Sequence, residues 1–144
     1  MNKTTMPKSS DISRDWYVID VQDQVLGRVS STIAKYLMGK DKVDYIAHTD
    51  MGNNVIIINA GKVKLTGQKK KYLTVTRYSG YPGGLKTLRT QDLLVKKPED
   101  VIKHSVKGML PKNKLRDRYV ARLYIYEGET HPHEAQKPQE IKLS

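Results

Sequence analysis

The segment from Asn53 to Gly61, NNVIIINAG, limits the possible folds more than any other part of the chain. It is a nearly continuous apolar run bounded by turn-forming residues. A strand with one solvent-facing side alternates apolar and polar residues, whereas a continuous run indicates a strand that is covered on both faces. Such strands belong mainly to parallel sheets, so this run predicts an α/β protein.

Two segments that precede this run support the same fold class. WYVIDV, at 16–21, is rich in aromatic and β-branched residues and predicts a buried strand. The residues that follow place apolar side chains at helical spacing, at Leu26, Val29, Ile33 and Leu37. Gly39 is a helix stop signal. A strand, a helix and a second strand in this order predict a right-handed crossover within a parallel sheet.

The middle of the chain is less regular. KKKYLTVTRY, at 69–78, is rich in strand-forming residues, and the SGYPGG that follows it predicts a loop. Two helical segments are expected next, the first with Thr90 as its N-cap and the second beginning at Pro98. A last strand is expected around 123–126.

One domain with extensions accounts for the chain, because no internal repeat or clear linker divides its 144 residues. We expect a flexible N-terminal segment at 1–13, a single α/β domain at 14–128 and a proline-punctuated C-terminal tail at 129–144. The chain contains no cysteine, which excludes disulfides and thiolate metal sites. Its longest apolar run, VIII at 55–58, is far shorter than the roughly 20 residues that span a bilayer. A soluble protein that is not exported is therefore expected.

Positive charge is concentrated in one part of the sequence. Residues 62–118 contain 16 Lys or Arg and 4 acidic residues, whereas the rest of the chain has 10 basic and 11 acidic residues. No acid occurs between Met51 and Gln91. A surface evolved only for solubility mixes both signs of charge, so this distribution indicates a polyanionic partner. Nucleic acid is the favoured partner; an anionic membrane and a plain basic surface are the alternatives.

The glycine-rich stretch RYSGYPGGLK, at 77–86, lies inside this basic segment. It lacks the Gly-Lys-Ser/Thr of a Walker loop and the spacing of a dinucleotide-binding fingerprint, which disfavours a small-nucleotide enzyme. A plain turn and a loop that contacts RNA both remain. In the RNA interpretation, glycine lets backbone N–H groups approach phosphate and Arg77 and Lys86 neutralise it. Tyr78 and Tyr81 would stack on unpaired bases.

A second basic cluster is VKGMLPKNKLRDR, at 106–118. Its five cations accompany a single acid, Asp117, and they are Lys107, Lys112, Lys114, Arg116 and Arg118. A solvated helix face explains scattered lysines in most proteins. The density of cations here favours RNA binding instead, and the same argument extends to KKK at 69–71.

No catalytic, metal or cofactor site is predicted. In HPHE, at 131–134, two histidines could act as ligands, but a tail with prolines is a poor scaffold for a closed metal site, and local packing or capping explains them better. No nucleophile-elbow motif is present. Asp20 and Asp23 suit acid–base chemistry in principle, but a turn before the first helix explains them more simply.

Five segments occur in a specific order and spacing: WYVIDVQDQVLGRVSSTIAKYLMGK, NVIIINAGKVKLTGQKKK, YSGYPGGLK, VIKHSVKGMLPKNKL and HPHEAQKP. Together they resemble the bacterial-type family of large-subunit ribosomal protein thirteen, over about residues 14–140. SGYPGGLK followed by VKGMLPKN is the most specific pair. The HPHEAQ tail is similar to the bacterial and organellar branch of the family.

The resemblance implies a three-layer α/β/α fold around a small, largely parallel four-stranded sheet, with a basic loop extension. It also implies a structural, non-catalytic protein that binds large-subunit (23S-type) rRNA and supports subunit assembly. Its place would be the cytoplasm, within the large ribosomal subunit, beside neighbouring large-subunit ribosomal proteins. No membrane and no small-molecule substrate are implied.

The domain at 14–128 is therefore expected to bind RNA through three stretches, 69–71, 77–89 and 107–118. By residue type, the expected contacts are Lys69, Lys70, Lys71, Arg77, Tyr78, Tyr81, Lys86, Arg89, Lys107, Lys112, Lys114, Arg116 and Arg118. Two positions depart from the family pattern. Arg116 stands where a glycine is common, and Asn53 stands where an acidic residue is frequent.

Overall fold

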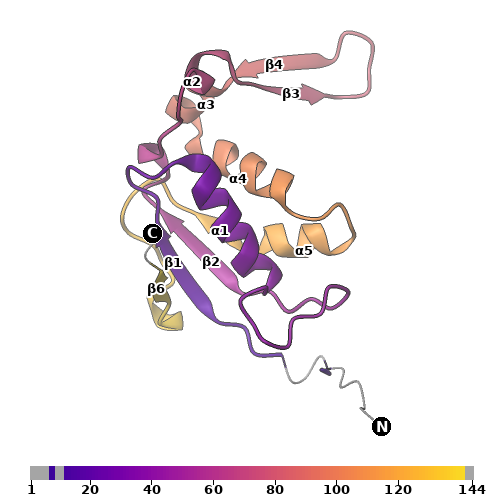
Figure 1. Cartoon of the computed structure of the whole chain (residues 1–144). Coiled ribbons are helices and arrows are strands. Elements are labelled where there is room, and N and C mark those ends of the chain that lie inside the picture. The colour runs from indigo at the N-terminus through magenta and orange to yellow at the C-terminus, as the bar shows by residue number, and fades with distance from the viewer. Residues whose placement is uncertain (1–6, 9–11, 142–144) are drawn as a thin grey trace.

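The computed structural model describes residues 7–8 and 12–141 of the chain (Figure 1). The segment expected to be flexible, 1–13, lies mostly outside the described residues.

The central sheet consists of β1 (Trp16–Asp20), β2 (Asn54–Ile58), β5 (Leu123–Ile125) and β6 (Gln139–Ile141). Its order is β5-β2-β1-β6, and every neighbouring pair is parallel. Val55, Ile56 and Ile57 of β2 are 0% exposed, as the continuous apolar run predicts for an inner strand. The expected α/β class and the four-stranded parallel sheet are therefore confirmed.

Helix α1 (Leu26–Met38) makes the predicted crossover from β1 to β2. The four apolar residues at helical spacing are all buried. The helix ends at Gly39, whose φ of 79° lies in the left-handed region, which favours glycine. A Cβ at this position would lie 2.6 Å from the Met51 carbonyl oxygen, so the chain also passes too closely there for a larger residue. The predicted stop signal is confirmed.

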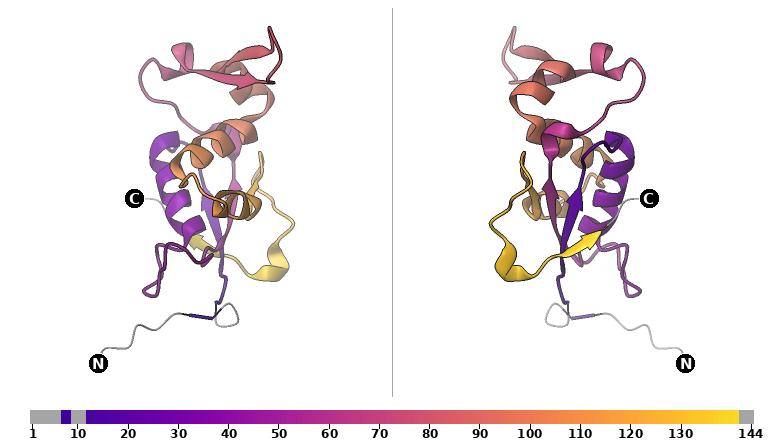
Figure 2. Two further views of the ribbon diagram at one scale, coloured as in Figure 1. Left: turned by 90° about the vertical axis from the view of Figure 1, so that its right-hand side faces the viewer. Right: turned by 90° about the vertical axis from the view of Figure 1, so that its left-hand side faces the viewer.

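The two faces of the sheet are covered differently. Helices α1, α4 (Pro98–Met109) and α5 (Leu115–Ala121) lie over the face that carries Ile19, Val55 and Ile57 (Figures 1 and 2). The opposite face meets the segment between β5 and β6, which contains only a short 3-10 turn, η3 (Glu134–Gln136). Within the described residues, this face is thus covered by η3 and the connecting segments around it.

Residues expected to form a C-terminal tail contribute to the sheet. β6 pairs with β1, with Tyr17 opposite Gln139 and Ile19 opposite Ile141. Before it, His133 lies against Trp16 and Tyr124, with ring centroids 5.2 and 4.7 Å apart. Residues of the segment 129–141 thus pack on the domain. The division of the chain into a domain at 14–128 and a tail at 129–144 stays a prediction.

Between β2 and β5 the chain leaves the sheet and builds a projecting arm. The arm comprises a helical turn α2 (Lys69–Tyr72), the antiparallel hairpin β3 (Thr74–Tyr78) and β4 (Leu85–Arg89), and helix α3 (Thr90–Lys96). The lysines at 69–71 are helical, so only the second half of the strand-forming segment 69–78 is a strand. Thr90 is the first residue of α3 and not its cap, because its hydroxyl donates to the Leu73 carbonyl at 2.8 Å.

No helix in the described part of the chain is long and apolar enough to cross a membrane.

Candidate nucleic-acid interface

The hairpin β3–β4 stands away from the sheet and its covering helices, as Figures 1 and 2 show. Every residue of the two strands is exposed except Val75, which is half-buried. An isolated two-stranded hairpin is marginally stable in water, so this element has little core of its own. Its exposed side chains are therefore available to a partner.

The register of the hairpin sorts its side chains into two faces. Arg77 pairs with Lys86, and Tyr78 pairs with Leu85. Successive residues of a strand point to opposite faces, so the two cations lie on one face and Tyr78 and Leu85 on the other. Tyr78 and Leu85 are 64% and 61% exposed, respectively. Next to its turn, the hairpin thus presents a pair of cations on one face and a pair of apolar side chains on the other; farther from the turn, Leu88 lies on the face of Arg77 and Arg89 on the face of Tyr78.

Directly opposed like charges destabilise an antiparallel pair. The Arg77–Lys86 pair is such an arrangement, and no carboxylate among the described residues forms an ion pair with either side chain. An anion bound between the two cations would relieve the repulsion. This local conflict between sequence and fold is typical of a functional surface.

The glycines between the strands shape a turn. Gly80 and Gly83 have φ angles of 89° and 72°, which favour glycine. A Cβ on Gly84 would lie 2.1 Å from the Ser79 hydroxyl oxygen, and the Gly84 N–H donates to the Tyr81 carbonyl at 2.9 Å. Because that N–H is already used, the turn interpretation accounts for Gly84 better than a phosphate cradle does. Tyr81 remains 75% exposed at the tip of the hairpin.

The second basic cluster lies around the end of α4 and the start of α5. Lys107, Lys112, Lys114 and Arg118 are exposed. In Figure 1, the loop between α4 and α5 and the tip of the hairpin extend toward the same side of the molecule. The structure thus places both predicted basic stretches on one side, with α2 and α3 at the base of the hairpin.

Arg116 differs from the other cations of this cluster. Its guanidinium donates to the Pro111 carbonyl at 3.1 Å through Nε and to the Leu110 carbonyl at 2.9 Å through Nη2. These bonds close the turn after α4 by tying the guanidinium to two backbone carbonyls just beyond the end of the helix. The residue that departs from the family pattern therefore has a structural explanation, which the sequence did not reveal.

The predicted interface cations are not ion-paired within the described residues, a property that they share with several other lysines and arginines. Four salt bridges occur among the described residues, and their cations are Arg14, Lys62, Lys64 and Arg122. None of the thirteen predicted contact residues takes part in them. Exposed cations without a carboxylate partner can engage phosphates without first breaking an internal pair.

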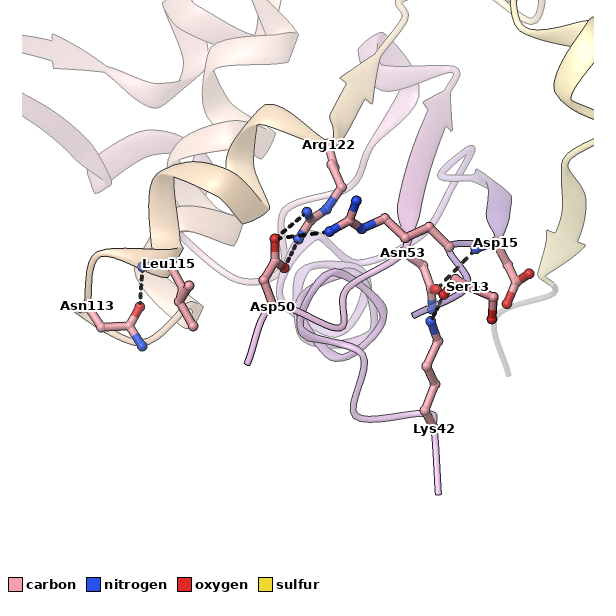
Figure 3. Close-up of polar contacts among 9 residues, drawn as sticks. Ser13, Asp15, Lys42, Asp50, Asn53, Asn113, Leu115 and Arg122 are labelled. Carbon is pink, nitrogen blue, oxygen red and sulfur yellow. Dashed lines mark hydrogen bonds and ion pairs between the residues drawn. The ribbon is translucent and has the colours of Figure 1, made fainter. Parts of the chain in front are cut away.

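A buried ion pair holds α5 against the loop before β2. The Asp50 carboxylate accepts hydrogen bonds from both terminal nitrogens of Arg122, and Arg14 lies 3.6 Å from it (Figure 3). The side chains of Asp50 and Arg122 are only 11% and 13% exposed. Burial alone raises the pKa of Asp50, but the Arg122 hydrogen bonds and charge, together with Arg14, lower it below its ordinary value.

The second departure from the family pattern, Asn53, lies beside this pair and is 0% exposed. Its amide nitrogen donates to both carboxylate oxygens of Asp41, at 3.3 and 3.1 Å. Its carbonyl accepts from the Asp15 N–H at 3.3 Å (Figure 3). An acidic side chain here would repel Asp41. Asn53 therefore fits its surroundings in this chain.

Two exposed residues beside the predicted contacts were missed. Tyr72, 65% exposed, lies on α2 with the Lys71 ammonium 5.5 Å from its ring centroid, and Leu85 is the apolar partner of Tyr78. The position of Tyr72 directly after three lysines could have identified it from the sequence. The role of Leu85 required the strand register.

The histidines of the HPHE segment are used in packing. The ring of His133 shares a hydrogen bond of 2.8 Å with the Tyr126 hydroxyl, and the backbone N–H of His133 donates to His131 Nδ1 at 3.2 Å. Within residues 7–8 and 12–141, no three metal-ligating side chains gather in a group.

Comparison with known proteins gives a consistent result. The family profile described as Ribosomal protein L13 matches residues 14–132. A protein of Caldanaerobacter subterraneus described as large ribosomal subunit protein uL13 is 51% identical, over 98% of this chain and 99% of its own length. Proteins with the same description from Streptomyces avermitilis and Trichormus variabilis are 49% and 46% identical, over 99% and 100% of this chain and 97% and 95% of their own lengths.

Proposed function

The chain belongs to the ribosomal protein L13 family, and from this membership we propose that it is a structural, non-catalytic component of the large ribosomal subunit that binds rRNA and supports subunit assembly. The observation that carries the proposal is the group of predicted cations on the projecting arm and at the α4–α5 turn, which form no ion pairs within the described residues. Phosphate is the ligand that such cations fit.

The central sheet and its helices act as a rigid platform. The Asp50–Arg122 pair fixes α5 to the loop before β2, and this holds the basic turn between α4 and α5 in place. Contacts from Lys and Arg to phosphates supply affinity and register, whereas shape and base stacking supply the choice of site.

The hairpin contributes through both of its faces. Arg77 and Lys86 bind phosphates on one face, and Tyr78 and Leu85 lie against bases or sugars on the other, which also carries Arg89. Tyr81 stacks on an unpaired base at the tip, where base–aromatic stacking contributes about 1–3 kcal/mol. Arg116 acts by holding the neighbouring turn and not through phosphate.

A salt titration tests this binding mode. The full chain is bound to a large-subunit rRNA fragment on filters over a series of KCl concentrations. With Arg116 set aside, the ten other predicted cations give a log–log slope of roughly −7 if each neutralises one phosphate of single-stranded RNA. An affinity that hardly changes with salt would contradict the proposal.

Sedimentation tests the place of the protein in the cell. A lysate is separated at high salt, and the chain is expected to remain in the large-subunit peak in stoichiometric amount. Recovery mainly in a free pool would argue against a structural role in the subunit even if the chain binds RNA.

A further inference from the structure

A groove opens on the sheet face that the helices leave uncovered. Its volume is about 430 Å³. Val18 and Ile58 supply apolar surface, and the carboxylates of Asp20 and Glu140 lie beside them. The described residues that line it all lie outside 62–118, so the groove belongs to the part of the chain without excess positive charge.

The strand register explains how acidic and apolar groups alternate there. Val18 is paired with Glu140 on β6, and Asp20 is paired with Ile58 on β2. Side chains of paired neighbours lie about 5 Å apart, and residues i and i+2 of one strand share a face. Each carboxylate is therefore flanked by an aliphatic side chain within the groove.

The carboxylates are held in place and remain accessible. One oxygen of Asp20 accepts from the Gln22 N–H at 2.9 Å and from the Asn59 side-chain amide at 3.0 Å, while the residue is exposed. Glu140 is exposed and takes part in no salt bridge among the described residues. Both therefore retain acceptor capacity that a cationic partner can use.

The groove borders a free sheet edge. β6 is the last strand in the order β5-β2-β1-β6, so one side of its backbone lacks a strand partner among the described residues. An exposed edge is a template on which an extended peptide adds as a further strand through main-chain hydrogen bonds. Pockets for alternate side chains then give such a peptide its specificity.

We propose that this groove binds an extended, lysine- and arginine-rich segment of a protein partner, which adds to the free edge of β6. On the face with the groove, the aliphatic parts of its long basic side chains extend across β6 toward Val18, and their charged ends meet Glu140 and Asp20. RNA is repelled by the same two carboxylates. The basic arm and this groove thus serve partners of opposite charge, and the inference does not depend on the proposed RNA-binding function.

The test uses the full chain and a fluorescent ten-residue peptide of alternating lysine and valine, followed by anisotropy at low salt. Because the chain has a net charge of +11, a cationic peptide gains nothing from the overall field and must use a local acidic site. Binding that weakens as salt is raised is expected. A peptide of alternating glutamate and valine is expected to bind the basic surface instead, independently of the groove.

Matched charge reversals locate the site. Glu140→Lys is expected to weaken binding of the lysine–valine peptide about three- to tenfold, from the loss of one exposed pair and the repulsion that replaces it. Glu99→Lys, which makes the same change in charge at an exposed position on α4, is expected to alter it less than twofold. Equal effects of the two reversals, or no measurable binding, would overturn the proposal.

A chain shortened to end at Ile141 tests whether the groove is occupied by a partner or by the protein's own last residues. Unchanged peptide affinity supports an external segment as the occupant. Binding that appears only after the shortening would show that residues 142–144 fill the groove and would also overturn the proposal. The salt slope for rRNA is expected to stay the same in Glu140→Lys, so a failure here is distinct from a failure of RNA binding.

Discussion

The proposed interface predicts that cations of equal charge contribute unequally to RNA binding, according to whether they are ion-paired. Arg77→Gln combined with Lys86→Gln removes two cations that lie opposite each other on the hairpin. Loss of two phosphate contacts should make the log–log salt slope less steep by about 1.4. If the electrostatic contribution vanishes near 1 M salt, affinity falls about 25-fold at 0.1 M and about threefold at 0.5 M.

The matched control is Lys62→Gln combined with Lys64→Gln. These cations lie 3.4 and 2.8 Å from Glu129 and Asp23, respectively, and belong to the same basic stretch of the sequence. The control makes the same change in net charge, but we expect its salt slope to be nearly unchanged. Filter binding over a KCl series measures both doubles. Equal slope changes would refute the argument, because affinity would then follow net charge and not the unpaired cations.

Three further predictions concern single residues. Asp50→Asn leaves Arg122 buried without its carboxylate and should lower the free energy of unfolding by about 3 kcal/mol in urea titrations; a loss below about 1 kcal/mol would contradict the role of the pair. The pKa of Asp50 is lower in the folded chain than in the unfolded chain. The stability that the Asp50 charge contributes is therefore complete above the unfolded pKa and is lost as pH falls through the folded pKa. The free energies of unfolding of the variant and the parent chain should therefore converge in acid. Tyr81→Ala should weaken RNA binding by about 1–3 kcal/mol in filter assays if the ring stacks on a base, and unchanged affinity would make Tyr81 a turn residue only. Arg116→Ala should lower the melting temperature while changing the salt slope less than Lys112→Ala does; the reverse order would assign Arg116 to phosphate.

The central part of the fold was predictable because its signals are local. The run of apolar residues in β2 requires cover on both faces, and the spacing in α1 places one stripe on the sheet. Gly39 ends the helix because its backbone is left-handed and because the nearby Met51 carbonyl leaves no room for a side chain. Such features depend little on the rest of the chain.

The outer elements were not predictable for the opposite reason. β6 is three residues long, and two of them, Gln139 and Glu140, are polar. It becomes a strand by pairing with β1, more than a hundred residues earlier in the chain. The helical turn α2 is likewise only four residues long, and a tertiary contact, from Thr90 to Leu73, fixes the start of the next helix.

The candidate site likewise has features that the sequence predicts and features that depend on the fold. One-sided charge identified the basic segment, and turn-forming residues identified the loop of the hairpin. The sequence could not tell that Arg116 bonds to backbone carbonyls or that Lys62 and Lys64 are ion-paired, because their partners depend on how the chain folds. The individual RNA contacts stay predictions.

Topology explains how one small domain keeps opposite charges apart. β2 and β5 are neighbours in the sheet, yet the chain between them contains the arm, α4 and α5. A crossover between adjacent parallel strands can be lengthened at its outer end without disturbing the strand pairing. The basic stretch, 62–118, lies entirely within this connection, whereas β1 and β6, which flank the acidic groove, lie outside it. Shortening the hairpin should therefore weaken RNA binding and leave the sheet, together with its peptide groove, intact.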